Sequence, residues 1–313
     1  MNVLLTGGTG FIGSHVLVEL LKHGHEVTIL ARNANKVPFL KTMPHVTLLQ
    51  IAMNEYDKIP EAVNGKDAVV HVALNMTGET AFNVLMSDTA STVFLATEAA
   101  KAGVKKFVYT SSTASVDSVY ASPNPVCIKP GEKLVTIDCR HDPCSYYGAT
   151  KAASEDFLFA IEGQTGMKVN IIRPGYTFGN PAVLGAFIQP DQRFTNIVKS
   201  ALQGEPIHLV KNDGTQFIWA DDISQVYANV LQSNFSMKTY FALSKEFVTW
   251  EQIARDAVKL CNSSSKIEIE DLGWSNTPTI FDVSNIMQDF NLVFYAYPHI
   301  ISHLTWLKET FQQ

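Results

Sequence analysis

The sequence predicts an α/β fold, namely a Rossmann-type doubly wound parallel sheet that carries a smaller C-terminal α/β lobe. Short apolar runs alternate with helix-like segments through the first 175 residues, a pattern typical of parallel strands joined by right-handed crossovers. The chain also opens with Thr6-Gly-Gly-Thr-Gly-Phe-Ile-Gly13, a glycine-rich turn between an apolar run and a helical one. We therefore expect a dinucleotide-binding domain over 1–175 and a substrate-binding lobe, interleaved with it, over 176–313.

The first predicted elements are a strand, a glycine turn and a helix. Val3-Leu4-Leu5 has the composition of a buried strand, and helical periodicity begins near Phe11. Glycine lets the backbone take positive φ and lets a pyrophosphate approach closely. The free N–H groups at the start of the helix favour an anion. The residues expected to bind the cofactor here are Gly7, Gly10, Phe11, Ile12 and Gly13.

The remaining elements follow from apolar runs and helical periodicity. Further strands of the main sheet are predicted at 27–31, 46–50, 68–73, 106–110 and 169–173. The longest helix between them is predicted over 82–102, because Gly103 is a typical helix end, and another is predicted over 145–162. The lobe is assigned strands at 207–210, 216–219 and 239–243, and helices near 192–203, 221–233, 249–261 and 298–311.

Charge and cysteine content narrow the class of protein. The 313 residues carry a net charge of −6, which argues against a nucleic-acid partner. No apolar stretch is long enough to span a membrane, and the first strand leaves no room for a signal peptide, so we expect a cytoplasmic protein. The four cysteines suit a reducing compartment. Since Cys127, Cys139, His141 and Cys144 lack a standard zinc spacing, we expect no metal site.

Three side chains suggest proton-transfer chemistry. Tyr147 and Lys151 lie four residues apart at the predicted start of a helix and so share one face. A tyrosine hydroxyl ordinarily has a pKa near 10, and a nearby cation favours the phenolate, which brings proton transfer toward neutral pH. Ser112 follows the strand at 106–110, at the end of the sheet where ligands bind. We predict that Ser112 hydrogen-bonds the reacting oxygen and holds it against Tyr147.

Together these motifs resemble the extended short-chain dehydrogenases/reductases, the superfamily that includes NAD(P)-dependent sugar-nucleotide epimerases and dehydratases. The resemblance covers nearly the whole chain and includes His71-Val-Ala73 and Arg173-Pro-Gly-Tyr-Thr-Phe-Gly179. It implies that Ser112, Tyr147 and Lys151 form the catalytic triad and that Lys151 also binds the nicotinamide ribose. It further implies a homodimer formed through the helices near 83–102 and 145–162. The additional cofactor contacts it implies are Ala73, Thr110, Tyr147, Lys151 and Pro174.

Several residues depart from the family pattern. Ala31 ends the second strand where NAD-preferring members carry an acid, and Arg32 follows it. A guanidinium without a carboxylate suits a 2′-phosphate, so we favour NADP(H) over NAD(H). Asp88 falls where the family has an active-site asparagine that takes part in the usual proton relay, so the chain departs from the family pattern at this position. Phe217 directly follows Gly-Thr-Gln, where sugar-nucleotide members commonly have an arginine that binds the phosphates.

These observations predict an NAD(P)-dependent oxidoreductase that transfers hydride at a secondary alcohol or ketone of a small molecule. One alternative is an NAD-dependent sugar-nucleotide epimerase, which uses the same residues and retains its cofactor. A second alternative is a protein that binds a dinucleotide without catalysis.

Three further expectations concern the loops and the lobe. The segment 116–143 is long enough to be a functional loop that closes over a substrate. Asp221 and Asp222 are expected to cap the helix that follows them. Most lobe aromatics are expected to be core residues rather than ligand contacts; they are Tyr176, Phe178, Phe187, Phe194, Phe217 and Trp219.

Overall fold

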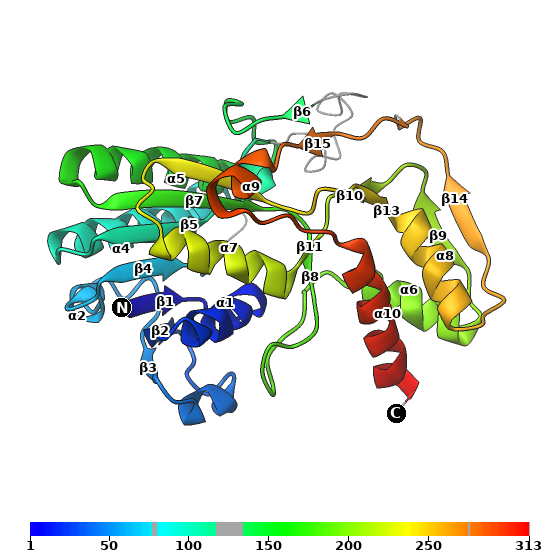
Figure 1. The fold of residues 1–313 in the computed structure, drawn as a ribbon, viewed down its shortest axis with the longest axis horizontal. Helices are drawn as coiled ribbons and strands as arrows, with labels where there is room; N and C mark the ends of the chain where they lie inside the picture. Colours follow the sequence, from blue (N-terminus) through cyan, green and yellow to red (C-terminus); the bar gives the residue numbers. More distant parts are fainter. Residues whose placement is uncertain (77–79, 117–133, 275, 313) are drawn as a thin grey trace.

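The main domain is a parallel sheet between two layers of helices (Figure 1). The computed structural model describes residues 1–76, 80–116, 134–274 and 276–312. The seven-stranded sheet has the order β12-β7-β5-β4-β1-β2-β3, and every neighbouring pair is parallel. Its strands are β1 (Asn2–Thr6), β2 (Glu26–Ala31), β3 (Val46–Gln50), β4 (Ala68–His71), β5 (Lys106–Thr110), β7 (Lys168–Pro174) and β12 (Lys238–Ala242).

This strand order confirms the predicted fold class. Winding proceeds from β1 through β2 to β3, and then restarts on the other side of β1 with β4. The crossovers from the two halves therefore diverge between β1 and β4, which leaves a crevice at the carboxyl ends of these strands. Dinucleotides bind in such a crevice in Rossmann folds.

Alternate residues along the strands fill two separate cores. Val3 and Leu5 lie in the core covered by α1 (Phe11–Lys22) and α7 (Ala220–Gln232). Leu4 lies in the opposite core. The helices of that layer are α2 (Ile59–Val63), α4 (Ala90–Lys101) and α5 (Tyr146–Thr165). Because both faces of the sheet are covered, its strands are continuously apolar rather than alternating in polarity.

The helix predicted over 82–102 is interrupted by a π-helical turn. It consists of α3 (Ala81–Val84), the π turn η2 (Leu85–Thr89) and then α4. A π turn adds one residue to a helical turn and changes the direction in which the side chains point. Asp88 lies in this turn and is only 1% exposed. The sequence pattern gave no sign of the interruption.

The smaller lobe has its own core. It is enclosed by α6 (Arg193–Gln203), α8 (Trp250–Leu260) and α10 (Tyr297–Gln312). β9 (Ile207–Val210) pairs with β14 (Ile267–Glu270) along its outer side (Figure 1). The remaining short elements are η1 (Pro38–Thr42), η3 (Thr113–Ser115), β6 (Leu134–Val135), β8 (Thr177–Phe178), β10 (Gly214–Thr215), β11 (Ile218–Trp219), β13 (Val248–Thr249), β15 (Ile280–Phe281) and α9 (Ser284–Phe290).

Two segments that the sequence assigned to the lobe belong to the main domain. The strand expected at 239–243 is β12, the outermost strand of the main sheet beside β7. The helix expected at 221–233 is α7, which packs beside α1. The lobe assignment was wrong because a short apolar run does not specify which sheet it joins. The strand expected at 216–219 is shorter, since only β11 (Ile218–Trp219) falls within it and β10 ends before it at Thr215.

The predicted cap of α7 is also corrected. Trp219 is the N-cap residue, and Asp221 and Asp222 lie in the first turn of the helix. Asp221 instead lies 2.6 Å from Nδ1 of His15 on α1 and accepts a hydrogen bond from the Trp219 indole at 3.2 Å. These carboxylates still complement the positive end of the helix dipole.

The lobe aromatics largely follow the expectation. Phe178, Phe194, Phe217 and Trp219 are buried in the lobe core. Tyr176 is partly buried against the same core. Phe187 is the exception, because 45% of it is exposed.

A buried charge cluster fastens α5 to the carboxyl ends of β5 and β7. Arg173 of β7 donates from Nε and Nη2 to the Glu155 carboxylate, at 3.0 and 2.6 Å. His141 Nε2 lies 3.0 Å from the same carboxylate, and the Ser111 hydroxyl also donates to it. Burial alone would raise the pKa of Glu155, but the hydrogen bonds from His141 and Arg173 outweigh it and lower the pKa to about 2. Glu155 is therefore a carboxylate that holds three segments together.

We expect His141→Gln to destabilise the protein more in acid than in base. The hydrogen bond to Glu155 is the largest of the influences that raise the pKa of His141 above 6.5. The folded state therefore favours the protonated imidazole. This contribution to stability is fully present below the unfolded pKa and is lost as the pH rises through the higher folded pKa.

The prediction is tested by measuring the urea denaturation midpoints of the wild type and of His141→Gln at about pH 5.5 and about pH 9. The difference between the wild type and the variant should be larger at the lower pH. A difference that is the same at both pH values would mean that His141 contributes only as a neutral hydrogen-bond partner.

We expect Gly13→Ala to lower the free energy of unfolding by about 2–4 kcal/mol. A Cβ at Gly13 would lie 2.1 Å from the Gly7 carbonyl oxygen, so α1 would have to move away from the turn after β1. Gly163 of α5 is a matched control, because a Cβ there meets nothing within 4 Å. Gly163→Ala should stabilise the protein by about 0.5–1 kcal/mol in the same denaturation assay. Equal effects at the two positions would contradict the steric argument.

Candidate active site

A cleft of about 590 Å³ lies at the carboxyl ends of the central strands. Its wall is formed by the turns that follow β1, β2, β4 and β5, by the first turns of α5, and by the segment after β7. All of the residues predicted to bind cofactor or to act in catalysis line this one cleft; they are Gly7, Gly10, Phe11, Ile12, Gly13, Arg32, Ala73, Thr110, Ser112, Tyr147, Lys151 and Pro174.

The glycine turn forms a side-chain-free floor at the start of α1. Gly7 has a φ of +75°, and a Cβ there would lie 2.7 Å from the Ala73 amide nitrogen. Gly10 is the N-cap of α1 and donates its N–H to the Gly7 carbonyl at 2.8 Å. The first turn of α1 carries no acidic residue. The turn therefore fits a pyrophosphate, which would bind the backbone and the positive end of the helix dipole.

Two cations line the cleft just beyond β2. Arg32 follows the last residue of β2, and Lys36 lies four residues later in the same loop. None of the described residues that line the cleft is a carboxylate. The pair therefore suits a second anionic group beside the pyrophosphate site. The sequence prediction included Arg32 but missed Lys36. A second cation in the same short loop could have indicated that Lys36 lines the same part of the cleft.

Helix caps position the Ser112 hydroxyl and the Tyr147 phenol. Ser112 is the N-cap of η3 and accepts a hydrogen bond from the Ala114 N–H at 3.1 Å, which leaves its own O–H available to a ligand. Ser145 caps α5 by accepting from the Gly148 N–H at 3.0 Å, so that the helix begins just before Tyr147. A Cβ at Gly148 would lie 2.2 Å from the Ala114 carbonyl oxygen. Glycine at this position allows α5 to lie directly against η3.

Lys151 is buried and paired with Asp88. Its ammonium nitrogen lies 3.6 Å from Asp88 Oδ2, and both side chains are almost fully buried. The same nitrogen lies 5.8 Å from the centroid of the Tyr147 ring. Burial lowers the pKa of Lys151, but Tyr109, Asp88 and Tyr147 together outweigh it and raise the pKa above 10.5. The site thus holds an ammonium ion next to Tyr147, with its charge balanced from the π turn.

Asn75 holds this π turn against the wall of the cleft. Its backbone N–H donates to Asp88 Oδ1 at 3.1 Å, and its side-chain amide donates to the Ser87 carbonyl at 3.0 Å. Asn75 also lines the cleft. It was not predicted from the sequence, because its role depends on a turn that the sequence pattern did not show.

His71 supports the strand ends from behind the cleft. Its two ring nitrogens lie 2.6 and 2.9 Å from the hydroxyls of Thr6 and Thr92. Burial is the main cause that lowers the pKa of His71 to about 3, and the Lys151 charge adds to it. His71 is therefore neutral and acts as a fixed hydrogen-bonding link between β1, β4 and α4.

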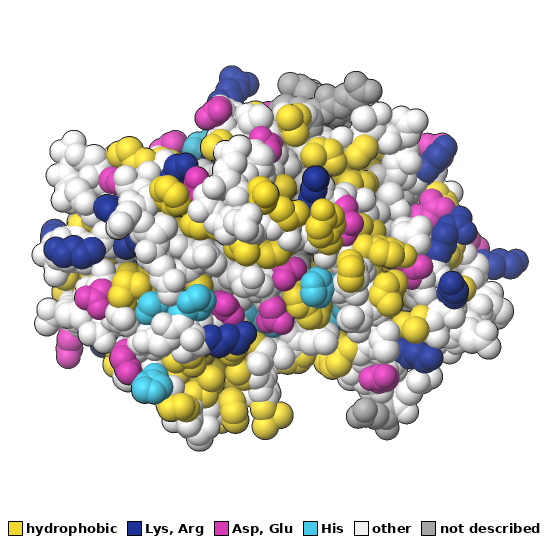
Figure 2. All heavy atoms as spheres, in the orientation of Figure 1, with side chains coloured by type: hydrophobic (Ala, Val, Ile, Leu, Met, Phe, Trp, Pro, Cys, Tyr) yellow, Lys and Arg dark blue, Asp and Glu magenta, His cyan; other side chains and the backbone are white. Residues whose placement is uncertain are grey.

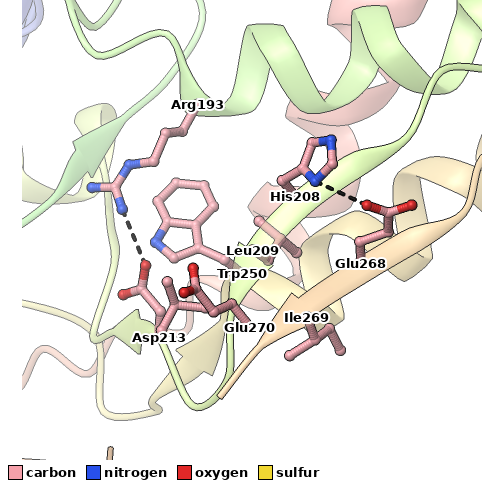
Figure 3. A pocket seen from close by; sticks show the side chains of 9 residues that line it. Arg193, His208, Leu209, Asp213, Trp250, Glu268, Ile269 and Glu270 are labelled. Carbon is pink, nitrogen blue, oxygen red and sulfur yellow. Dashed lines mark ion pairs between the residues drawn. The ribbon is translucent and has the colours of Figure 1, made fainter. Parts of the chain in front are cut away.

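A second hollow of about 430 Å³ lies on the lobe (Figure 3). Four of its charged or titratable groups form two pairs, since Arg193 lies 3.5 Å from Asp213 and His208 lies 3.1 Å from Glu268. The Arg193 guanidinium also covers the ring of Trp250, at 4.4 Å from the ring centroid. This hollow contains none of the predicted site residues. The cleft in the main domain is therefore the better candidate for the active site.

Some expectations fall partly or wholly outside the described residues. The loop expected over 116–143 includes 117–133, which lie outside them, as does Cys127. Among the described residues, no three His, Cys, Asp or Glu side chains are grouped as metal ligands. Within the same residues, no helix is both long and apolar enough to cross a membrane.

Several curated proteins are similar in sequence. The UDP-N-acetyl-alpha-D-glucosaminuronate decarboxylase of Bacillus cytotoxicus is 28% identical over 275 residues, which is 84% of this chain and 81% of that protein. A UDP-glucose 4-epimerase of Neisseria meningitidis is 34% identical over 51% of this chain and 48% of its own length. A 3 beta-hydroxysteroid dehydrogenase/Delta 5→4-isomerase of Mycobacterium tuberculosis is 31% identical over 57% and 48% of the two chains.

Solved structures share the fold at low sequence identity. The UDP-glucose 4-epimerase of Thermotoga maritima with UDP-glucose has a TM-score of 0.80 at 17% identity, covering 99% of this chain and 100% of that one. The UDP-glucuronic acid 4-epimerase of Bacillus cereus in complex with NAD also has a TM-score of 0.80, at 19% identity and 99% coverage of both chains. The model of the NAD dependent epimerase/dehydratase family matches residues 3–241. This chain therefore belongs to the NAD dependent epimerase/dehydratase family, within the extended short-chain dehydrogenases/reductases.

Proposed function

We propose that the protein is an NADP(H)-dependent reductase or dehydrogenase that acts at a secondary alcohol or ketone of a small molecule. The observation that carries the proposal is that Ser112, Tyr147 and Lys151 line the same cleft as the glycine turn and Arg32. A hydroxyl, a phenol beside an ammonium ion, and an anion-binding helix start are the groups that such a reaction requires.

The roles of these residues follow from their chemistry. When bound, the nicotinamide ring supplies or accepts the hydride. In the reductive direction, the Tyr147 hydroxyl donates its proton to the carbonyl oxygen, while the Ser112 hydroxyl hydrogen-bonds the same oxygen. Lys151 stabilises the negative charge that remains on the Tyr147 oxygen, and Asp88 keeps Lys151 charged and in place. In the oxidative direction, Tyr147 accepts the proton from the alcohol.

The preference for NADP(H) rests on the loop after β2. Arg32 and Lys36 both line the cleft, and no carboxylate among the described lining residues is present to bind an adenosine ribose 2′-hydroxyl. Charge-assisted bonds from both cations would stabilise a 2′-phosphate. The B. cereus relative was solved with NAD, so a preference for NADP(H) would distinguish this chain from it.

Phe217 supports a reductase rather than a sugar-nucleotide epimerase. It stands where sugar-nucleotide members commonly carry a phosphate-binding arginine, and it is completely buried in the lobe core. It therefore offers no charge to a substrate diphosphate. Epimerisation remains the second candidate, because the family match and the similar solved structures include epimerases.

We also propose that the protein is a homodimer in the cytoplasm. Each of the two helical segments expected at the subunit contact presents a large apolar side chain, since Phe82 of α3 is 68% exposed and Phe157 of α5 is 54% exposed. Aromatic residues are enriched at protein interfaces. Among the described residues, Cys139 and Cys261 are free thiols, which is consistent with a reducing compartment.

We expect Arg32→Asp to reverse the cofactor preference. Removing the guanidinium should weaken NADPH binding about 10- to 100-fold, because a charge-assisted hydrogen bond is lost and a carboxylate repels the phosphate. NADH binding should improve, since the new carboxylate can accept from the ribose 2′-hydroxyl. Titration of the nucleotide-free protein with each cofactor gives both dissociation constants. Arg255→Asp on α8, outside the cleft lining, controls for the change in net charge.

The same preparation tests the epimerase alternative. The purified protein is unfolded, and any nucleotide released is identified and counted. Stoichiometric, tightly held NAD would support an epimerase and would contradict the role given to Arg32. An empty protein that binds NADPH more tightly than NADH would support the exchanging reductase. A protein that binds neither cofactor would contradict both.

We expect Tyr147→Phe to reduce turnover of a ketone substrate by about 10²- to 10⁴-fold, the usual loss when a general acid is removed. Cofactor affinity should stay unchanged, because the ring and Lys151 remain. Tyr146→Phe is the matched control, since the neighbouring tyrosine is 54% exposed and absent from the cleft lining. Oxidation of NADPH with a panel of ketones supplies the measurement. Retained turnover in the Tyr147 variant would exclude the proposed mechanism.

A further inference from the structure

The loop 180–190, between β8 and α6, lies against the cofactor cleft and is fastened at both ends. Near its end, Gln189 lines the cleft and donates from Nε2 to the Thr177 carbonyl at 2.6 Å. At its start, the Asn180 carbonyl lies 3.0 Å from Nε2 of His15 on α1. The position of the loop is therefore tied to the helix that begins at the glycine turn.

The loop meets the segment after β2 through one aromatic contact. The Lys36 ammonium lies 4.3 Å from the centroid of the Phe187 ring, the arrangement of a cation–π interaction. Figure 2 shows apolar side chains gathered at the lower edge of the molecule, where Figure 1 places these two segments. Phe187 is 45% exposed, so the ring is not held there by burial in a core.

This contact fixes a side chain that would otherwise be mobile. A surface lysine has many rotamers, and it loses that freedom when it binds an anion, which weakens the binding. In the structure, Lys36 already lines the cleft together with Arg32. The Phe187 ring covers one side of the ammonium, and the remaining N–H groups stay available to a second partner.

We propose that Phe187 is a positioning residue for cofactor selection. It holds Lys36 at the wall of the cleft, where the ammonium meets the 2′-phosphate of NADP(H). The inference rests on the proposed use of NADP(H) and adds to it a residue that selects the cofactor without touching the phosphate. A cofactor that lacks the 2′-phosphate gains nothing from the contact.

Phe187→Leu tests the proposal by removing the ring while keeping an apolar side chain. The dissociation constant for NADPH should rise about three-fold, the size expected from one exposed cation–π contact. The dissociation constant for NADH should not change. The Phe187→Tyr variant should bind NADPH as tightly as the wild type, because tyrosine also offers an aromatic face to Lys36. In a Lys36→Met background, Phe187→Leu should have no further effect on either cofactor.

Leu184→Ala is the control, because Leu184 is 79% exposed on the same loop. It should leave both dissociation constants unchanged. Equal changes for NADPH and NADH in Phe187→Leu would show that the residue only packs the loop, and would overturn the inference. Tighter NADPH binding would show that the ring competes with the phosphate for Lys36, and would overturn it as well. If Arg32→Asp weakens NADPH binding but Phe187→Leu does not, only this inference is overturned. If Arg32→Asp leaves NADPH binding unchanged, the cofactor assignment on which the inference rests is overturned.

Discussion

The buried pair of Glu155 and Arg173 is the interaction on which the geometry of the site depends. A carboxylate inside a protein is costly unless its oxygen atoms are paired. The partners of Glu155 are Arg173 on β7, Ser111 just after β5 and His141 in the segment before α5. The carboxylate is therefore paired only while these three segments are in place around α5. Lys151 lies one turn before Glu155 on the same helix. The charge cluster therefore fixes the position of the face of α5 that carries Lys151 relative to the sheet.

A second charged pair, Lys151 and Asp88, sets the charge beside Tyr147. Lys151 is buried beside Tyr147, and an isolated ammonium there would tend to lose its proton. The Asp88 carboxylate at 3.6 Å opposes this tendency and is brought there by the π turn of η2. An asparagine at this position, as the family pattern has it, would offer a hydrogen bond but no compensating charge. The chain thus departs from the family pattern at a residue that forms an ion pair with Lys151, the lysine that we propose to be catalytic.

The two ends of the cleft are constructed differently. The end that we propose to be catalytic is formed by side chains at strand ends and on α5, and Ser112 and Lys151 there are buried and held by polar contacts. The end that we propose selects the cofactor is formed by exposed loop residues: Arg32 and Lys36 follow β2, and the Phe187 ring contacts Lys36. This NAD(P)-dependent oxidoreductase therefore keeps its shared chemistry in the rigid part of the fold. If Arg32 and Lys36 select the cofactor, as we propose, this selection depends on loops outside that part.

The sequence by itself determined the fold class and most of the cleft, because both are set by local signals. Apolar runs, glycine at a positive φ and hydroxyl residues after a strand act within a few positions of one another. Every predicted site residue consequently lies at one edge of one sheet. Only the tertiary structure decided that β12 and α7 join the main domain, that Asp88 faces Lys151, and that Phe187 meets Lys36. These contacts join segments far apart in the chain, and short apolar or charged stretches carry no information about which distant partner they will meet.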